Sequence, residues 1–375
     1  MLYREFGKTG FKISALGFGA MRLPEKEING KNVFDYDESI RVIRRGIDLG
    51  INYIDIAYSY CNKESEIIVG KALKDGYRQK VKIATKFPTW SVNSPDDFQR
   101  YLDEQLKKLD VDKIDFYHFH ALNENNWENT IIRFKLIDRA FKAKDEGKFD
   151  HLSFSFHDKP EVLKKIIDSS FFESMLVQYN ILDRSNEEMI AYAASRGLAV
   201  AIMGSVGGGR LGENSDAIMK MAPNDVRTTP DLALRFVLSN PNVHCALSGM
   251  NTIKMVEENV ATASSDRLLT SEELKKIDHI SQVYKEKSDL ICTYCKYCMP
   301  CPNGVNIPLN FRFYNYYHIY EIKNFAREQY KLIGKLPWYE GKQASECTEC
   351  GECEPKCPQK IPIINQLKET HNILK

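Results

Sequence analysis

The sequence predicts an eight-stranded (β/α)8 TIM barrel followed by a small, mainly α-helical, cysteine-rich domain. Residues 1–285 alternate short apolar segments with amphipathic ones, and eight such units follow one another at a spacing of about 30 residues. Beyond residue 285 this pattern stops, and eight of the ten cysteines lie there. At 375 residues the chain exceeds one ordinary hydrophobic core. We therefore expect two domains, residues 1–285 and residues 286–375.

Eight segments are predicted to be strands because most are rich in β-branched or aromatic residues and lie near a Gly, Asp or Asn break. They are Ser14–Gly19, Ile51–Ala57, Val81–Lys86, Ile114–Phe119, His151–Ser155, Met175–Tyr179, Ala199–Met203 and Val243–Leu247. Amphipathic segments such as Asp37–Leu49 and Pro95–Leu109 are expected helices, with Asp37 and Ser94 as N-caps. Eight β–α units indicate a closed barrel rather than an open sheet.

Three further segments complete the expected architecture. Leu2–Ile13 holds glycines between apolar residues, which suggests a hairpin that closes the bottom of the barrel. Ser271–Lys287 has the pattern of a polar helix that leads out of the barrel. Ile307–Ile333 is rich in Phe and Tyr, and we expect one or two helices that pack aromatic faces around the cysteines.

The charge and hydropathy of the chain give no reason to expect binding to a nucleic acid or a membrane. The chain has 52 basic and 51 acidic side chains and a net charge of +1, which gives no electrostatic reason to expect a nucleic acid or an anionic membrane. No apolar stretch approaches the ~20 residues that span a bilayer. Residues 1–7 show no basic stretch followed by an apolar run, so no signal peptide is expected. We expect a soluble cytoplasmic protein in a reducing compartment.

Eight cysteines fall into two dense runs. Two residues separate each cysteine of the first run from the next, and the spacings of the second run are two, two and three residues. A proline follows the last cysteine of each run. The runs are Cys292, Cys295, Cys298, Cys301 and Cys347, Cys350, Cys353, Cys357. The pair resembles a two-cluster [4Fe–4S] ferredoxin module, although the first run is one residue shorter than the bacterial spacing.

This resemblance implies two [4Fe–4S] clusters with crossed ligands, because the fourth cysteine of each run reaches the other cluster. One cluster is then expected on Cys292, Cys295, Cys298 and Cys357, and the other on Cys347, Cys350, Cys353 and Cys301. Zinc is an alternative, although four-coordinate zinc sites usually use two separated CxxC pairs. Disulfides are a second alternative and would need an oxidising compartment.

Side chains suited to acid–base chemistry lie where three of the expected strands end. Asp55 lies near the end of the second strand, Tyr60 follows that strand, and Lys86 ends the third. The fourth strand carries His118 and His120 on one face, so spacing alone does not choose between them, although His120 lies nearer to the C-terminal end. Catalytic residues of such barrels come from this rim, so we expect an active site here.

At these residues the chain resembles the aldo-keto reductases, over about residues 1–265. Asp-x-x-x-x-Tyr after the second strand, Thr-Lys after the third and Asp-x-Tyr-x-x-His after the fourth form that family's catalytic signature. The resemblance implies that the catalytic residues are Asp55, Tyr60, Lys86 and His120. Tyr60 would give a proton to the substrate oxygen, and Lys86 would lower the pKa of Tyr60. Asp55 would hold Lys86, and His120 would orient the carbonyl.

The resemblance also implies contacts to NADP(H) or NAD(H). Ser155 and Gln178 would hold the nicotinamide carboxamide. Met203 stands where an aromatic residue commonly stacks on the nicotinamide. Glu258 and Asn259 align with contacts to adenine.

The remaining cofactor contacts are expected in a glycine-rich loop and after the last strand. Gly207 and Gly208 would let the backbone approach a pyrophosphate closely, and Arg210 would supply a positive charge. The alternative is a rim loop without a ligand. Met255 stands where the family has an arginine for the 2′-phosphate, with Lys254 beside it, so the choice between NADP(H) and NAD(H) stays open.

Three functions fit these features. The first is an aldo-keto reductase-type oxidoreductase that reduces or forms a carbonyl, with clusters that relay electrons to or from a partner protein or a bound flavin. The second is an ordinary NAD(P)H-dependent carbonyl reductase whose clusters are structural or sense oxygen. The third is an electron carrier or scaffold with an inactive barrel, and the complete set of four rim residues argues against it.

The first function carries a physical difficulty, because clusters usually pass single electrons whereas a nicotinamide passes a hydride. A flavin would join the two, and the loop Gly204–Arg210 could bind its phosphate. The sequence leaves the flavin and a redox partner protein open. The expected substrate is a small carbonyl or alcohol, with Trp90 and Trp127 as walls of its pocket.

Overall fold

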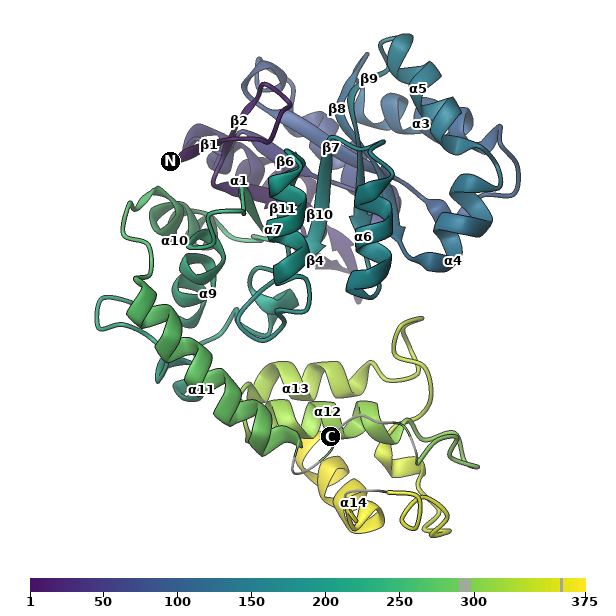
Figure 1. The fold of residues 1–375 in the computed structure, drawn as a ribbon, viewed down its shortest axis with the longest axis vertical. Coiled ribbons are helices and arrows are strands. Elements are labelled where there is room, and N and C mark those ends of the chain that lie inside the picture. Colours follow the sequence, from purple (N-terminus) through teal and green to yellow (C-terminus); the bar gives the residue numbers. More distant parts are fainter. Residues whose placement is uncertain (290–291, 293–295, 297, 358–359) are drawn as a thin grey trace. The chain divides into compact units, whose positions relative to one another are not determined.

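The computed structural model describes residues 1–375 except 290–291, 293–295, 297 and 358–359 (Figure 1). The chain forms two compact units. The first contains Met1–Gly207 and Ala233–Leu269, and the second contains Gly208–Leu232 and Thr270–Lys375. The segment Gly208–Leu232 therefore leaves the first unit and belongs to the second, although chain on either side of it belongs to the first.

The core of the first unit is a closed barrel of eight parallel strands, and the predicted fold class is confirmed. Each strand hydrogen-bonds to the next in chain order, and the last pairs with the first. All eight segments predicted to be strands contribute to it. The strands are β3 (Leu16–Gly19), β6 (Tyr53–Asp55), β7 (Lys82–Phe87), β8 (Ile114–Leu122), β9 (Phe149–Phe156), β10 (Ser174–Gln178), β11 (Ala199–Met203) and β12 (Cys245–Ser248).

Two antiparallel hairpins flank the first barrel strand. The predicted one joins β1 (Tyr3–Glu5) to β2 (Lys12–Ser14), and Phe6 beside it packs in the core against residues at the N-terminal ends of the barrel strands. The second, β4 (Glu25–Ile28) with β5 (Lys31–Phe34), was not predicted. Its turn is Asn29-Gly30 with φ of 53° and 74°, which is a strong hairpin signal that the exposed, polar strands obscured.

Helices surround the barrel in the first unit (Figure 1). They are α1 (Tyr36–Asp48), α2 (Ser65–Ala72), α3 (Asp97–Leu109), α4 (Glu124–Asn126), α5 (Leu136–Asp145), α6 (Pro160–Asp168), α7 (Glu187–Ser195) and α10 (Ile253–Ser264), and α9 (Thr229–Leu238) crosses from one unit to the other. Both predicted N-caps are wrong by two residues. Asp35 caps α1 by accepting from the N–H of Glu38, and α3 begins after Asp96.

The second unit is mainly helical. Its helices are α8 (Asp216–Met219), α11 (Ser271–Asp289), α12 (Ile307–His318), α13 (Lys323–Lys331) and α14 (Ile363–Leu374). The predicted helices in Ser271–Lys287 and Ile307–Ile333 are thus confirmed. Phe311, Phe313 and Tyr330 pack in one core that includes or contacts Cys292, Cys298, Cys301, Cys347, Cys353 and Cys357. Among the described residues, no helix of either unit combines the length and apolarity needed to span a membrane.

Candidate active site

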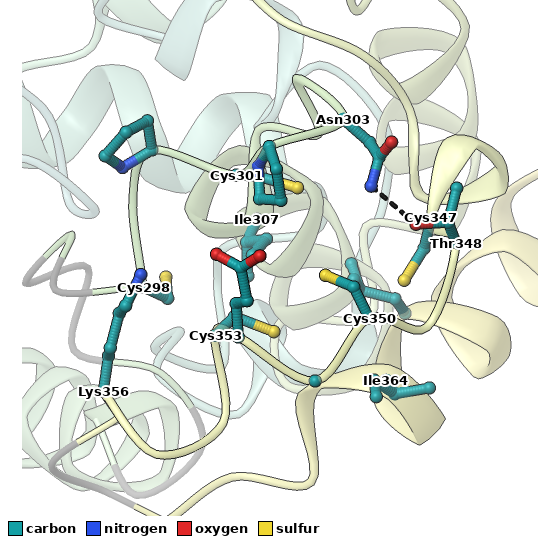
Figure 2. A pocket seen from close by; sticks show the side chains of 15 residues that line it. Cys298, Cys301, Asn303, Ile307, Cys347, Thr348, Cys350, Cys353, Lys356 and Ile364 are labelled. Atoms are coloured by element: carbon teal, nitrogen blue, oxygen red, sulfur yellow. Dashed lines mark hydrogen bonds between the residues drawn. The ribbon is translucent and has the colours of Figure 1, made fainter.

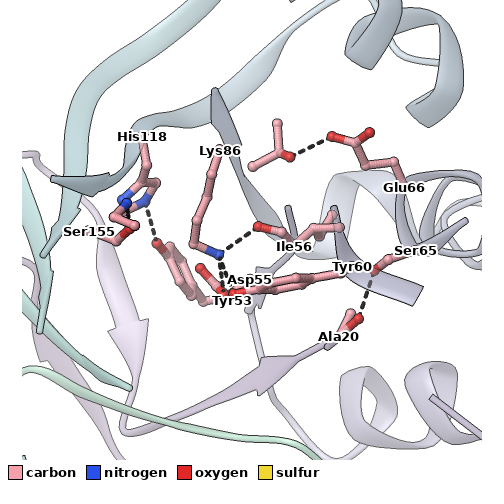
Figure 3. Close-up of polar contacts among 12 residues, drawn as sticks. Ala20, Tyr53, Asp55, Ile56, Tyr60, Ser65, Glu66, Lys86, His118 and Ser155 are labelled. Atoms are coloured by element: carbon pink, nitrogen blue, oxygen red, sulfur yellow. Dashed lines mark hydrogen bonds and ion pairs between the residues drawn. The ribbon is translucent and has the colours of Figure 1, made fainter. Parts of the chain in front are cut away.

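Lys86 is the centre of a buried polar cluster at the rim of the barrel (Figure 3). Its Nζ lies 2.6 Å from Oδ1 of Asp55, 2.6 Å from the carbonyl oxygen of Ile56 and 3.2 Å from the hydroxyl of Tyr60. Lys86 is 1% exposed and Asp55 is 3% exposed. A buried ammonium of this kind needs an anionic partner, and Asp55 on the neighbouring strand provides it.

His118 and His120 point their rings to different surroundings. Nε2 of His118 lies 3.4 Å from the hydroxyl of Tyr53, inside the barrel. The ring of His120 lies edge-on to Tyr60, with ring centroids 5.9 Å apart. Within the described residues, Nδ1 of His120 is buried without a hydrogen-bond partner. The structure therefore brings His120, rather than His118, beside the phenol of Tyr60.

The charge of Lys86 dominates the electrostatics of this cluster. Burial lowers the pKa of Lys86, but Asp55 and Tyr60 outweigh burial and raise it above its usual value. Burial raises the pKa of Tyr60, and the charge of Lys86 offsets only part of that rise. Lys86 thus acts in the expected direction, yet the net pKa of Tyr60 is raised because the phenolate loses its water.

Both histidines are neutral at pH 7. Burial, and then the charge of Lys86, lower the pKa of His118 to about 3. The same two causes, with His157 and His118 after them, hold the pKa of His120 well below its usual value. A neutral His120 can donate one hydrogen bond, and its ring does not repel the charged ammonium of Lys86.

A buried hydrogen-bond network supports the strand that carries Lys86. The hydroxyl of Thr85 donates to Oε1 of Glu66 at 2.7 Å, and Nε2 of Gln105 donates to the carbonyl oxygen of Lys86 at 3.1 Å. The hydroxyl of Tyr117 donates to Oε1 of Gln105 at 2.8 Å. Sequence reasoning missed Gln105, because a glutamine within an amphipathic helix carries no signal of burial.

The backbone after Tyr60 adopts an unusual conformation. Cys61, Asn62 and Lys63 have φ of 51°, 51° and 72°, three consecutive residues in the left-handed region without a glycine. Each such residue carries a steric cost of about 1–2 kcal/mol. The backbone is therefore strained directly after the residue that carries the phenol, and such strain is often found at functional sites.

The two tryptophans expected as pocket walls differ in position. Trp90 is 55% exposed, and its ring centroid lies 4.9 Å from that of His120. Trp127 is only 4% exposed and packs on Phe172 with centroids 6.1 Å apart. Trp90 therefore lies at the candidate site, whereas Trp127 is a buried packing residue, and its expected role as a wall is wrong.

The residues expected at the nicotinamide lie at the C-terminal ends of three neighbouring strands. Gln178 and Met203 are register partners on β10 and β11, and Ser155 lies near the end of β9. The hydroxyl of Ser155 accepts from the N–H of Ala121 at 2.7 Å, and Nε2 of Gln178 donates to Asp183 at 2.8 Å. These partners fix the directions of both polar side chains.

The expected adenine and phosphate contacts after β12 lie on α10. Nδ2 of Asn259 donates to the hydroxyl of Ser248 at 3.1 Å, and Asn259 is 8% exposed. Lys254 and Glu258 lie one turn apart on the exposed face and form an ion pair of 3.7 Å. An ion pair this exposed contributes little to stability, so both side chains remain available to a ligand.

The glycine-rich loop expected at the pyrophosphate follows β11. Gly207, Gly208 and Gly209 have φ of 61°, 64° and 100°, a run of left-handed conformations that suits glycine. The Arg210 guanidinium donates from Nη1 to the hydroxyl of Tyr316 on α12 at 2.6 Å. Gly207 belongs to the first unit, whereas Gly208 and Arg210 belong to the second.

In the second unit, cysteines of both runs line one pocket (Figure 2). Four of them are the ligands expected for one cluster, namely Cys301, Cys347, Cys350 and Cys353. Cys298 also lines the pocket, and Ile307, Ile364 and Leu367 make it partly apolar. A pocket that four thiols border suits a polynuclear cluster, since its ligands surround a volume rather than converge on one ion. In the described residues, no three His, Cys, Asp or Glu side chains form a site for a single metal ion.

The other expected ligand set is only partly described. Cys292 is buried, and Cys298 and Cys357 pack against the same core. Cys295 lies outside the described residues. Among the described cysteines, the structure contains no disulfide.

Comparison with known proteins covers both units. The aldo/keto reductase family profile matches residues 15–282, and the profile of the 4Fe-4S dicluster domain matches residues 291–361. The oxidoreductase YqkF of Bacillus subtilis strain 168 is 28% identical over 320 residues, which cover 76% of this chain and 99% of the relative. L-galactose dehydrogenase of Arabidopsis thaliana is 26% identical over 291 residues, which cover 70% and 88%.

Solved structures of aldo-keto reductases share the fold of the first unit. An aldo-keto reductase of Bacillus halodurans in its holo form is 29% identical, with a TM-score of 0.64, and the match covers 75% of this chain and 96% of that one. An aldo-keto reductase of Klebsiella pneumoniae in complex with NADPH shares the fold at 24% identity, with a TM-score of 0.62 and coverage of 75% and 96%. The chain therefore belongs to the aldo/keto reductase family, as an oxidoreductase that carries a C-terminal 4Fe-4S dicluster domain.

Proposed function

We propose that this protein reduces the carbonyl group of a small substrate, or forms it in reverse, with Asp55, Tyr60, Lys86 and His120 as its catalytic residues. The observation that carries the proposal is the position of Lys86 Nζ, within 3.2 Å of the Tyr60 hydroxyl and 2.6 Å of Asp55. A bound nicotinamide would supply the hydride. Two relatives of this fold from Klebsiella pneumoniae contain NADP or NADPH, which supports that cofactor class.

Each of the four residues has a distinct task in this proposal. Tyr60 donates its proton to the substrate oxygen as negative charge develops there. Lys86 stabilises the phenolate that remains, and Asp55 keeps Lys86 charged and in place. His120 is neutral and its Nδ1 has no acceptor within the described residues, so its proton belongs on Nε2, from which it can donate to the carbonyl oxygen.

The residues proposed to contact the cofactor lie at the C-terminal ends of the barrel strands or in the segments that follow them. Ser155 and Gln178 hold the carboxamide beside Met203, and Gly207, Gly208 and Arg210 meet the pyrophosphate. Lys254, Glu258 and Asn259 on α10 meet the adenosine end. Because Met255 offers no charge, Lys254 is the cation in this segment that would favour a 2′-phosphate.

For the second unit we propose a role in electron transfer with a partner protein. Two clusters are expected there, with crossed ligands as described above, and clusters supply electrons one at a time. The pocket lined by Cys301, Cys347, Cys350 and Cys353 supports one of the two ligand sets. Two adjacent clusters can form an electron pathway, whereas a single metal site would suffice to stabilise a small domain.

One set of experiments tests both parts. Anaerobically purified protein is mixed with a simple aldehyde and either NADPH or NADH, and turnover is followed by nicotinamide absorbance. Turnover with at least one cofactor is expected, and the absence of turnover with both would refute the reductase. Rapid mixing followed by paramagnetic resonance should show cluster reduction or oxidation at the turnover rate. Clusters that stay unchanged while the carbonyl is reduced would instead favour a structural role.

A further inference from the structure

The chain from the loop after β11 to the first turn of α9 belongs to the second unit, which carries the iron–sulfur domain. The chain leaves the first unit at Gly207 and re-enters it at Ala233, and the residues between pack with Thr270–Lys375. We call Gly208–Leu232 the excursion. It begins within the glycine-rich loop that we propose for the cofactor pyrophosphate.

Three side-chain contacts attach the start of the excursion to α12 and its surroundings. Arg210 Nη1 donates to the hydroxyl of Tyr316 at 2.6 Å. The hydroxyl of Ser215 donates to the carbonyl oxygen of Tyr320 at 2.6 Å. Asn324 Nδ2, on α13, donates to Glu213 Oε2 at 2.9 Å. Three attachments within six residues define the path of this part of the chain.

These three contacts matter for the conformation of the loop because three glycines precede them. Gly207, Gly208 and Gly209 lack side chains, and glycine loses more backbone freedom on ordering than any other residue. A run of three cannot fix its own conformation, so the direction of Arg210 depends on what holds the residues after it. Because Tyr316 accepts from the guanidinium, it restricts the rotamers of that long side chain before any ligand binds.

Tyr316 is itself held firmly. Its ring packs against Phe313, Tyr320 and Phe325, with centroid distances of 6.2, 6.2 and 6.0 Å. The Arg210 guanidinium also lies 5.4 Å from the centroid of this ring. Removal of the hydroxyl alone would therefore leave the ring in place and remove one acceptor of the Arg210 guanidinium.

From these contacts we propose that Tyr316 is a positioning residue for nicotinamide binding. It acts through Arg210, whose side-chain rotamers the Tyr316 hydroxyl restricts before the cofactor binds. The inference rests on the proposed function of Arg210 at the pyrophosphate. Preorganisation lowers the entropic cost of binding, so its loss should weaken cofactor affinity and leave proton transfer at Tyr60 unchanged.

The test compares Tyr316→Phe with Tyr317→Phe in the full, cluster-loaded chain. Tyr317 is the next tyrosine on α12, and its hydroxyl accepts from Arg327 within the second unit at 3.3 Å. Equilibrium binding of NADPH and NADH is measured by fluorescence. We expect Tyr316→Phe to raise the Kd and KM of the cofactor about 3–10-fold, with kcat and the KM of the aldehyde within about two-fold of wild type. Tyr317→Phe should leave all four constants unchanged.

Amide hydrogen exchange without cofactor provides a second readout that does not depend on catalysis. Exchange of residues 207–216 should accelerate in Tyr316→Phe and not in Tyr317→Phe. Unchanged exchange, or an unchanged cofactor Kd in Tyr316→Phe, would overturn the inference while the proposed reductase stands. If the wild type bound neither nicotinamide, the proposed cofactor site would fall, and the role of Tyr316 with it.

Discussion

The hydroxyl of Tyr53 lies 3.4 Å from Nε2 of His118. His118 is one of two histidines on the same face of β8, and this contact gives its ring a hydrogen-bond partner inside the barrel. His120, two residues further along, lies beside Tyr60 instead. Strand alternation puts both imidazoles on one side, but only the one nearer the C-terminal end reaches the rim. The Tyr53–His118 pair thus belongs to the barrel interior, and His120 is available to a substrate.

The first prediction separates the two histidines. His120→Gln should lower kcat/KM for an aldehyde about 100-fold, because the neutral donor to the carbonyl is lost or displaced. His118→Gln should lower the free energy of unfolding by about 1–3 kcal/mol through its buried contacts and change kcat/KM much less. Steady-state kinetics and denaturant unfolding measure the two effects. The opposite pattern would assign catalysis to His118.

Tyr60→Phe should lower kcat about 100-fold or more, since the proton donor disappears while the ring remains. Its cofactor Kd should stay within about two-fold of wild type, because the hydroxyl contacts Lys86 rather than the expected cofactor residues. The matched control is Tyr58→Phe, whose hydroxyl donates to Glu104 at 3.3 Å outside the cluster. Equal turnover in the two variants would reject Tyr60 as the acid.

The pH dependence follows from the raised pKa of Tyr60. Carbonyl reduction needs the protonated phenol, so its rate should stay level through neutral pH and fall only as pH rises through that pKa. Lys86 opposes the rise, and Lys86→Met should therefore shift the falling limb to higher pH. Turnover should also drop, because the phenolate loses its nearest positive charge. Profiles of kcat/KM against pH check both, and an unshifted limb would contradict the role of Lys86.

Crossed cluster ligation makes a prediction about pairs of substitutions. Cys301→Ala combined with Cys347→Ala should remove ligands of the same cluster, leaving about four of about eight iron atoms per chain. Cys301→Ala combined with Cys298→Ala should damage both clusters and leave few iron atoms. Iron and sulfide analysis of anaerobic protein distinguishes them. If each run closed on its own cluster, the two double variants would exchange their iron contents.

The sequence predicted the barrel well because most of the eight segments are rich in β-branched or aromatic residues, lie near a Gly, Asp or Asn break and recur at a spacing of about 30 residues. It placed Asp55, Tyr60 and Lys86 at one rim because strand ends meet there. Strand spacing alone could not separate His118 from His120, and His120 was preferred because it lies nearer the C-terminal end of the strand and matches the family's signature. Sequence reasoning misjudged Trp127 because a tryptophan in a rim loop gives the same signal whether it faces the pocket or packs on Phe172. The N-caps were off by two residues because several acidic residues cluster at each helix start.

The contacts of the excursion also set an order of events during synthesis. Its three attachments join residues 105, 106 and 111 positions apart, so Arg210, Glu213 and Ser215 leave the ribosome long before their partners exist. At translation rates of about 5–20 residues per second, the delay is roughly 5–20 s. When Ser215 leaves the ribosome, every strand of the barrel except β12 has been synthesised. β12 is synthesised next, still before Tyr316, Tyr320 and Asn324. A nascent chain therefore passes through a stage in which the strands of the barrel can pair while residues 210–215 lack these three contacts, and synthesis of residues 316–324 then supplies the partners.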